Sequence, residues 1–171
     1  MTVQERKYWK AIRHVVHEYA NFVSSAEMTL TGKDIKGSHF ESPINTHVSH
    51  AYYLNCRKLA DFFLSIQSKQ SDNVLANEYV SGFTVALRVH KRRRGRINKQ
   101  LAHITYARNS GSREIKKRTQ GLLYLELKKT WRLFRKRLPK LYADEFVRQL
   151  KKRKAPHRNG QLSEFRYYDL D

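Results

Sequence analysis

The chain has 171 residues and a formal net charge of +20. Its single cysteine, Cys56, excludes a disulfide framework and predicts a reducing, cytoplasmic location. Seven Gly and three Pro are few for the turns of an all-β fold, and no segment is apolar enough to span a membrane. We therefore expect an all-α, single-domain bundle of about five to six helices over residues 1–154, followed by a tail, 155–171.

The first part of the chain predicts a long helix over residues 3–25, because apolar residues recur there at helical spacing. Thr2 is the expected N-cap, and Glu5, three residues later, completes a capping box. Residues 28–42 lose the helical period and contain two Gly, so we expect a long connection there.

A second helix is expected over residues 43–66, with Ser42 as its cap and Pro43 in its first turn. Arg57 and Asp61 are four residues apart on this helix and can pair across one turn. If the helix stripe that carries Arg57 and Asp61 is exposed, their ion pair contributes little to stability. If it is buried, Asp61 becomes a candidate positioning carboxylate, and the sequence leaves both options open.

The middle of the chain predicts a short helix over residues 73–81, capped by Asp72 and ended by Gly82. Residues 83–89 alternate apolar and polar side chains and are expected to lead, in extended form, into the next helix. That helix is predicted over residues 95–109, where Ile97, Leu101 and Ile104 form a narrow core face.

The last two helices are expected over residues 113–137 and 140–154, separated by Pro139. Both carry apolar residues at helical spacing, and both end in basic clusters that suit the negative end of the helix dipole. The tail after them ends in an apolar cluster that is expected either to dock on the body or to meet a partner: Phe165, Tyr167, Tyr168 and Leu170.

The positive charge is concentrated in one continuous block. Residues 88–154 hold twenty-four Lys and Arg against four Asp and Glu, whereas residues 1–87 hold nine against eight. Such a localised field predicts a polyanion partner, nucleic acid above all. The expected nucleic-acid-binding residues are Arg88, Lys91, Arg92, Arg93, Arg94, Lys99, Lys128, Lys129, Arg132, Arg135, Lys136, Arg137, Lys151, Lys152, Arg153 and Lys154.

Neither a metal nor another cofactor is predicted. His14 and His17 are three residues apart, as are His47 and His50, but no nearby Cys or acidic residue completes a metal site. Glycine-rich phosphate loops and paired-Cys spacings are missing from the sequence. Cys56 stands among apolar neighbours, which argues against a catalytic thiol.

Arg96 and His103 form the one candidate catalytic pair. They are seven residues apart, so they lie about 20° from each other on one helical stripe. A histidine of near-neutral pKa can move the proton of a ribose 2′-hydroxyl, and an arginine can hold the scissile phosphate. Without catalysis, His103 would be a hydrogen-bonded boundary histidine, and Arg96 another phosphate-binding cation.

The arrangement of Arg96, six intervening residues and His103 resembles the Arg…His motif of the HEPN superfamily. This resemblance implies a helical, commonly dimeric protein, and many HEPN proteins are metal-independent ribonucleases of toxin–antitoxin or phage-defence systems. It further implies that Arg96 and His103 are the catalytic pair and face their symmetry mates across a homodimer cleft.

The sequence thus predicts a nucleic-acid-binding protein, with RNA favoured over DNA. One hypothesis is a HEPN-like endoribonuclease or an inactive relative. The alternative is a non-catalytic basic subunit of a larger ribonucleoprotein or phage assembly. A third option is attachment to an anionic membrane surface or an acidic protein, although no membrane partner is expected.

Overall fold

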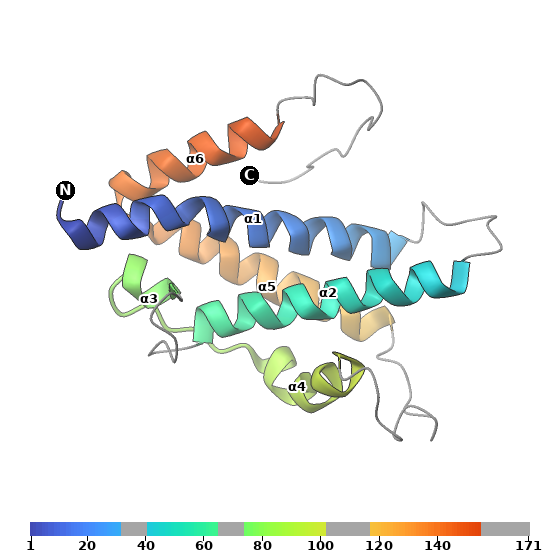
Figure 1. Cartoon of the computed structure of the whole chain (residues 1–171). Helices are drawn as coiled ribbons and strands as arrows, with labels where there is room; N and C mark the ends of the chain where they lie inside the picture. Colours follow the sequence, from blue (N-terminus) through green and yellow to red (C-terminus); the bar gives the residue numbers. More distant parts are fainter. Residues whose placement is uncertain (32–40, 65–73, 102–116, 155–171) are drawn as a thin grey trace.

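The computed structural model describes residues 1–31, 41–64, 74–101 and 117–154, and in these residues the chain is all-α. The expected fold class is confirmed, because the described residues form six helices and no strand. The helices are α1 (Val3–Thr31), α2 (Glu41–Leu64), α3 (Ala76–Tyr79), α4 (Arg88–Leu101), α5 (Lys117–Arg137) and α6 (Lys140–Lys154) (Figure 1). The tail, 155–171, lies outside the described residues.

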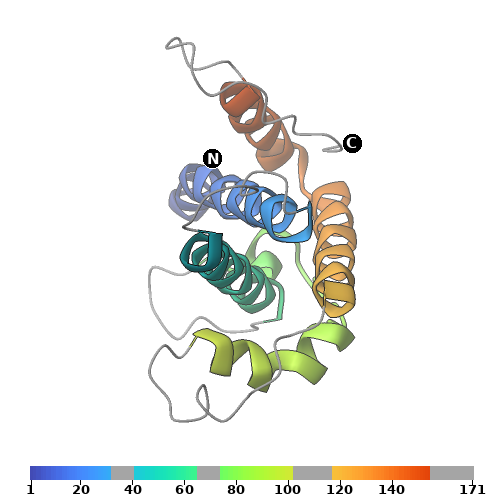
Figure 2. The same cartoon turned by 90° about the vertical axis from the view of Figure 1, so that its right-hand side faces the viewer.

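The helices are arranged around a central pair. Helices α1 and α2 run antiparallel and lie side by side, and α5 packs along one side of both (Figures 1 and 2). Helix α6 folds back from α5 onto α1, whereas α4 lies beyond α2 at the opposite side of the bundle (Figure 2). Helix α4 contacts both α2 and α5, so these two helices determine its position.

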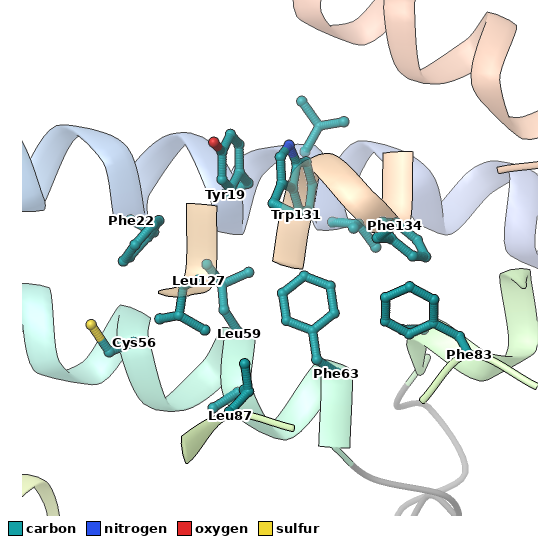
Figure 3. Close-up of a cluster of buried hydrophobic side chains, with 14 of the residues drawn as sticks. Tyr19, Phe22, Cys56, Leu59, Phe63, Phe83, Leu87, Leu127, Trp131 and Phe134 are labelled. Carbon is teal, nitrogen blue, oxygen red and sulfur yellow. The ribbon is translucent and has the colours of Figure 1, made fainter. Parts of the chain in front are cut away.

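The core lies between α1, α2 and α5 and is rich in aromatic side chains (Figure 3). The Trp131 indole stacks on the Tyr19 ring, with ring centroids 3.9 Å apart and planes 5° from parallel. Phe134 packs edge-to-face against Phe63, with centroids 5.9 Å apart. Such pairs contribute about 0.5–1.5 kcal/mol each beyond their buried area. The apolar spacing predicted for α1 is confirmed, since Ile12, Tyr19 and their neighbours on that stripe are buried.

Buried hydrogen bonds join α2 to its neighbours. The Tyr52 hydroxyl donates to the Gln120 carbonyl oxygen at 2.6 Å, and the Gln120 side-chain amide donates to the Tyr53 hydroxyl at 2.8 Å. On the other side, the Asn55 amide donates to Ser25 Oγ at 3.1 Å. An unpaired buried polar group costs about 1–3 kcal/mol, so these bonds favour one register of α2 against α1 and α5.

The capping box at the start of α1 is confirmed. The Thr2 N–H donates to Glu5 Oε2 at 2.6 Å, and the Glu5 N–H donates to Thr2 Oγ1 at 3.1 Å. The predicted end of this helix was wrong, because α1 continues to Thr31. Ala26 is fully buried and Leu30 packs against the core, so tertiary contacts extend the helix beyond its periodic stretch.

The predicted start of the second helix was also wrong. Helix α2 begins at Glu41, which places Ser42 and Pro43 inside its first turn, and Ser42 is not the cap. Pro43 is still tolerated there, because the N–H groups of the first turn have no partner within the helix. Helix α2 is described as far as Leu64, and its predicted end at residue 66 lies in residues 65–73, outside the described part of the chain.

The short third helix is confined to Ala76–Tyr79, within the predicted range 73–81. The Glu78 carboxylate reaches back to the Leu75 N–H at 2.6 Å and fixes its start. Gly82 lies in the turn that follows and has a φ of +69°, a left-handed conformation that favours glycine. The proposed cap, Asp72, is outside the described residues. Residues 83–87 are neither helix nor strand and lead into α4.

Candidate nucleic-acid interface

The basic run that begins at Arg88 is itself helical. Helix α4 spans Arg88–Leu101, so the expectation of a helix starting at residue 95 was wrong by seven residues. The predicted continuation to residue 109 lies outside the described part of the chain. The cations of the run are therefore displayed around a rigid helix, and their spacing is set by its geometry.

A carboxylate from another helix explains why α4 begins at Arg88. Glu126 of α5 accepts the Val89 N–H through Oε1 at 2.9 Å and the His90 N–H through Oε2 at 3.0 Å. The first turn of α4 contains no acidic residue of its own. Glu126 therefore satisfies N–H groups that lack a partner within the helix and places a negative charge at the positive end of the helix dipole.

Only a narrow stripe of α4 is buried. Ile97 is fully buried, as predicted, and His90, seven residues earlier on the same stripe, is 2% exposed. Leu101 packs against the core as a half-buried residue, whereas the third predicted core residue, Ile104, is outside the described residues. Most of the circumference of α4 is thus left to solvent.

The solvent-facing side of α4 is strongly basic. We use the name α4 basic face for its five exposed cations, Arg88, Lys91, Arg92, Arg94 and Arg96, while the neighbouring Arg93 is half-buried. None of these five forms an ion pair with a residue in the described part of the chain. On α6, by contrast, Arg148 Nε pairs with Glu145 Oε2 at 2.6 Å. The cations of the α4 basic face are therefore available to a phosphate ligand. The side chain of Lys99 is not described.

The other predicted cations are spread over α5 and α6. On α5, Lys129, Arg132, Lys136 and Arg137 are exposed, and Lys128 and Arg135 are half-buried. Lys128 Nζ lies 5.5 Å from the centre of the Tyr124 ring, a cation–π contact. On α6, Lys151 and Lys152 are exposed, and the side chains of Arg153 and Lys154 are outside the description.

These cations do not gather at one place. Helices α4 and α6 lie at opposite sides of the α1–α2 pair, and α5 runs between them (Figure 2). The block that is continuous in sequence is therefore an arc of three helices in space. A ligand on the α4 basic face is separated from the Lys151–Lys152 end of α6 by the body of the bundle.

The predicted catalytic pair is only half described. Arg96 is exposed on α4, next to the buried Ile97. His103 lies two residues beyond the last described residue of α4, so its distance from Arg96 and its surroundings stay a prediction.

No protein-family model, curated protein or solved structure matches the chain. The comparisons therefore add neither a family nor a functional residue to those found from the structure. The HEPN resemblance continues to rest on Arg96 and His103 in the sequence, and the candidate interface rests on the described residues.

His90 is a chemically notable residue that the sequence analysis missed. Its ring is buried, and neither ring nitrogen has a hydrogen-bond partner among the described residues. Burial lowers the pKa of His90, Arg94 lowers it further, and the carboxylates of Asp61 and Glu126 oppose this shift. His90 is thus a neutral core residue at neutral pH and is inaccessible to a substrate. Its spacing from Ile97 would have revealed it, had the helix been extended back through the basic run.

The two histidines of α1 contact their neighbours on the same helix. His14 is exposed and accepts from Arg13 Nε at 3.2 Å, and His17 is an exposed neighbour of Asn21 at 3.1 Å. Over the described ranges, no cluster of three or more potential metal ligands is found. Cys56 is buried, and burial raises the pKa of its thiol to about 12, which disfavours the reactive thiolate.

Two further questions left by the sequence concern Asp61 and the membrane. Asp61 Oδ2 lies 3.7 Å from Arg57 Nε, and both side chains are about half exposed. This is the exposed alternative, and such a pair contributes at most a few tenths of a kcal/mol to stability.

None of the helices in the described segments is both long enough and apolar enough to cross a bilayer.

Proposed function

We propose that this protein binds nucleic acid, RNA in preference to DNA, through the α4 basic face. One observation carries the proposal: five exposed cations stand on a helix of 14 residues, with no ion-pair partner in the described part of the chain. Nucleic-acid phosphates are the ligands that such an array attracts, because each neutralised phosphate releases a condensed counterion.

The energetics of α4 support this proposal over a role in solubility alone. Arg88 and Arg92, and likewise Arg92 and Arg96, are four residues apart on one helix, where like charges destabilise by a few tenths of a kcal/mol per pair. A surface that served solubility would intersperse acidic residues. Helix α4 instead keeps its acidic partner, Glu126, at the N-terminal backbone, where it stabilises the helix without neutralising the exposed face.

We propose binding without catalysis, because the described residues include the cations of the binding surface but not His103. Cleavage of RNA by Arg96 and His103 stays a hypothesis from the sequence, as does the homodimer that would bring two copies together. A place in a larger ribonucleoprotein or phage assembly is the non-catalytic form of the same proposal.

The experiment is a salt titration of binding to RNA and DNA of matched sequence. The variant Lys91→Gln/Arg92→Gln/Arg96→Gln is compared with a control on α1, Arg6→Gln/Lys10→Gln/Arg13→Gln, which removes the same charge from exposed positions. We expect the α4 variant to lose affinity and to lower the slope of log K against log salt by about one for each phosphate that is no longer neutralised. Binding that is weak and insensitive to salt, or equal losses in both variants, would overturn the proposal.

A further inference from the structure

Gly95 stands in the middle of the α4 basic face without a structural reason for being glycine. It is exposed in the interior of the helix, and a Cβ added there would meet nothing within 4 Å. Its φ is not positive, unlike that of Gly82. Glycine inside a helix destabilises it relative to alanine, so the packing and backbone of the protein would both accept a larger residue.

The position of Gly95 on the helix places it at the centre of the basic surface. It is two residues before the buried Ile97, which puts it about 160° around the helix, on the side facing away from the core. Its neighbours on the helix surface are the residues three or four positions away, and those with described side chains, Lys91, Arg92 and Asn98, are all exposed. Gly95 is therefore a bare stretch of backbone bordered by three side chains that donate hydrogen bonds.

We propose that Gly95 is the floor of a subsite for the sugar-phosphate backbone, an inference that rests on the proposed nucleic-acid binding. Without a Cβ, the helix backbone at Gly95 admits the closest approach of a nucleic-acid strand. Lys91 and Arg92 donate to the phosphate oxygens from one side of Gly95, and Asn98 donates from the other. A methyl group at this position would hold the strand away from the helix backbone and from the short Asn98 side chain.

The length of the surface favours a polymer over a single phosphate ion. From Arg88 through Gly95 to Asn98, the exposed donors extend over eleven residues of helix, or about 15 Å between the first and the last. A single phosphate would use only part of this length. A nucleic-acid strand carries phosphates at regular intervals and contacts donors along all of it.

The test compares two glycine-to-alanine variants, one within the α4 basic face and one outside it. Gly95→Ala adds a methyl group within the α4 basic face. Gly121→Ala adds one on α5, also where nothing lies within 4 Å, and serves as the matched control. Melting temperature is measured for both full-length variants, together with affinity for a short single-stranded RNA of mixed sequence and for its duplex.

We expect both variants to melt at a higher temperature than the wild type, and only Gly95→Ala to lose affinity. The expected loss is about tenfold, comparable to weakening one charge-assisted hydrogen bond to phosphate. Wild-type affinity in Gly95→Ala, or equal losses in both variants, overturns the subsite but leaves the salt-dependent binding intact. A lower melting temperature for Gly95→Ala also overturns it, because the glycine would then be structural. A wild-type protein that binds neither RNA removes the proposed function as well.

Discussion

Glu126 Oε2 on α5 accepts the backbone N–H of His90 on α4 at 3.0 Å, and Glu126 Oε1 accepts the backbone N–H of Val89 at 2.9 Å. A single carboxylate thus connects the helix that displays the α4 basic face to the core helix behind it. The bond is made at the backbone, so the cationic side chains stay free. The stability of the proposed interface therefore depends on a residue that does not belong to it.

The first prediction concerns this cap. Replacing Glu126 by Ala removes both acceptors and is expected to destabilise the protein by about 1–2 kcal/mol, the usual effect of losing an N-cap. Hydrogen exchange should accelerate at the first amides of α4 more than in α1. Asp144→Asn, which removes an exposed carboxylate from α6, is the control and should leave both measurements unchanged. If α4 exchanges normally in Glu126→Ala, Glu126 does not hold its start.

The second prediction concerns the pH dependence of stability. Burial lowers the pKa of His90 in the folded protein, while Asp61 of α2, Arg94 of α4 and Glu126 of α5 face it. In the pH range between this lowered pKa and the ordinary value of about 6.5, the unfolded chain binds more protons than the folded one. Stability therefore rises with pH through that range and is lost as the pH falls below about 6.5.

The measurement is urea unfolding at a series of pH values on both sides of 6.5. The variant His90→Gln should flatten the pH dependence in this range, and the exposed His14→Gln should leave it as in the wild type. The slope from one such group is at most about 1.4 kcal/mol per pH unit. A wild-type stability that stays constant or increases on acidification from pH 7 would exclude this role for His90.

The spacing of apolar residues predicted those features of the fold that are determined within a single helix. The buried face of α1 follows from apolar spacing alone, as Ile12 and Tyr19 illustrate. The spacing of α5 predicted Phe134 in the core correctly, but Leu122 and Leu125, also expected there, are exposed. The start of α4 could not be read locally, because its cap, Glu126, comes 36 residues after His90 in the chain. The separation of the basic helices in space could not be predicted from local sequence either, because it depends on how α5 and α6 pack around α1 and α2 (Figure 2).

The third prediction tests catalysis separately from binding. If Arg96 and His103 form a HEPN-like pair, the purified protein cleaves RNA in the presence of EDTA. His103→Ala should then abolish cleavage while retaining RNA affinity, because the α4 basic face is unchanged. His90→Gln is the control, since a buried histidine takes no part in cleavage. Cleavage that persists in His103→Ala removes this residue from the mechanism, and intact RNA with the wild type favours the non-catalytic binder.

The last prediction follows from the arc formed by the three basic helices. Because α4 and α6 lie at opposite sides of the α1–α2 pair, a short RNA on the α4 basic face does not reach Lys151 and Lys152 (Figure 2). We expect Lys151→Gln/Lys152→Gln to bind a short RNA nearly as the wild type does, with only the small loss due to a reduced long-range field. Lys91→Gln/Arg92→Gln removes the same charge from α4 and should weaken binding severalfold more.

A longer RNA distinguishes an arc from a single patch. A strand long enough to follow α5 can contact both ends, so the α6 variant should lose affinity as the RNA is lengthened, and its salt slope should fall with it. The measurement is an affinity series over RNA length at fixed salt for both double variants. Equal losses for both variants on the shortest RNA that binds would mean that the two ends act as one site, contrary to their placement on the bundle.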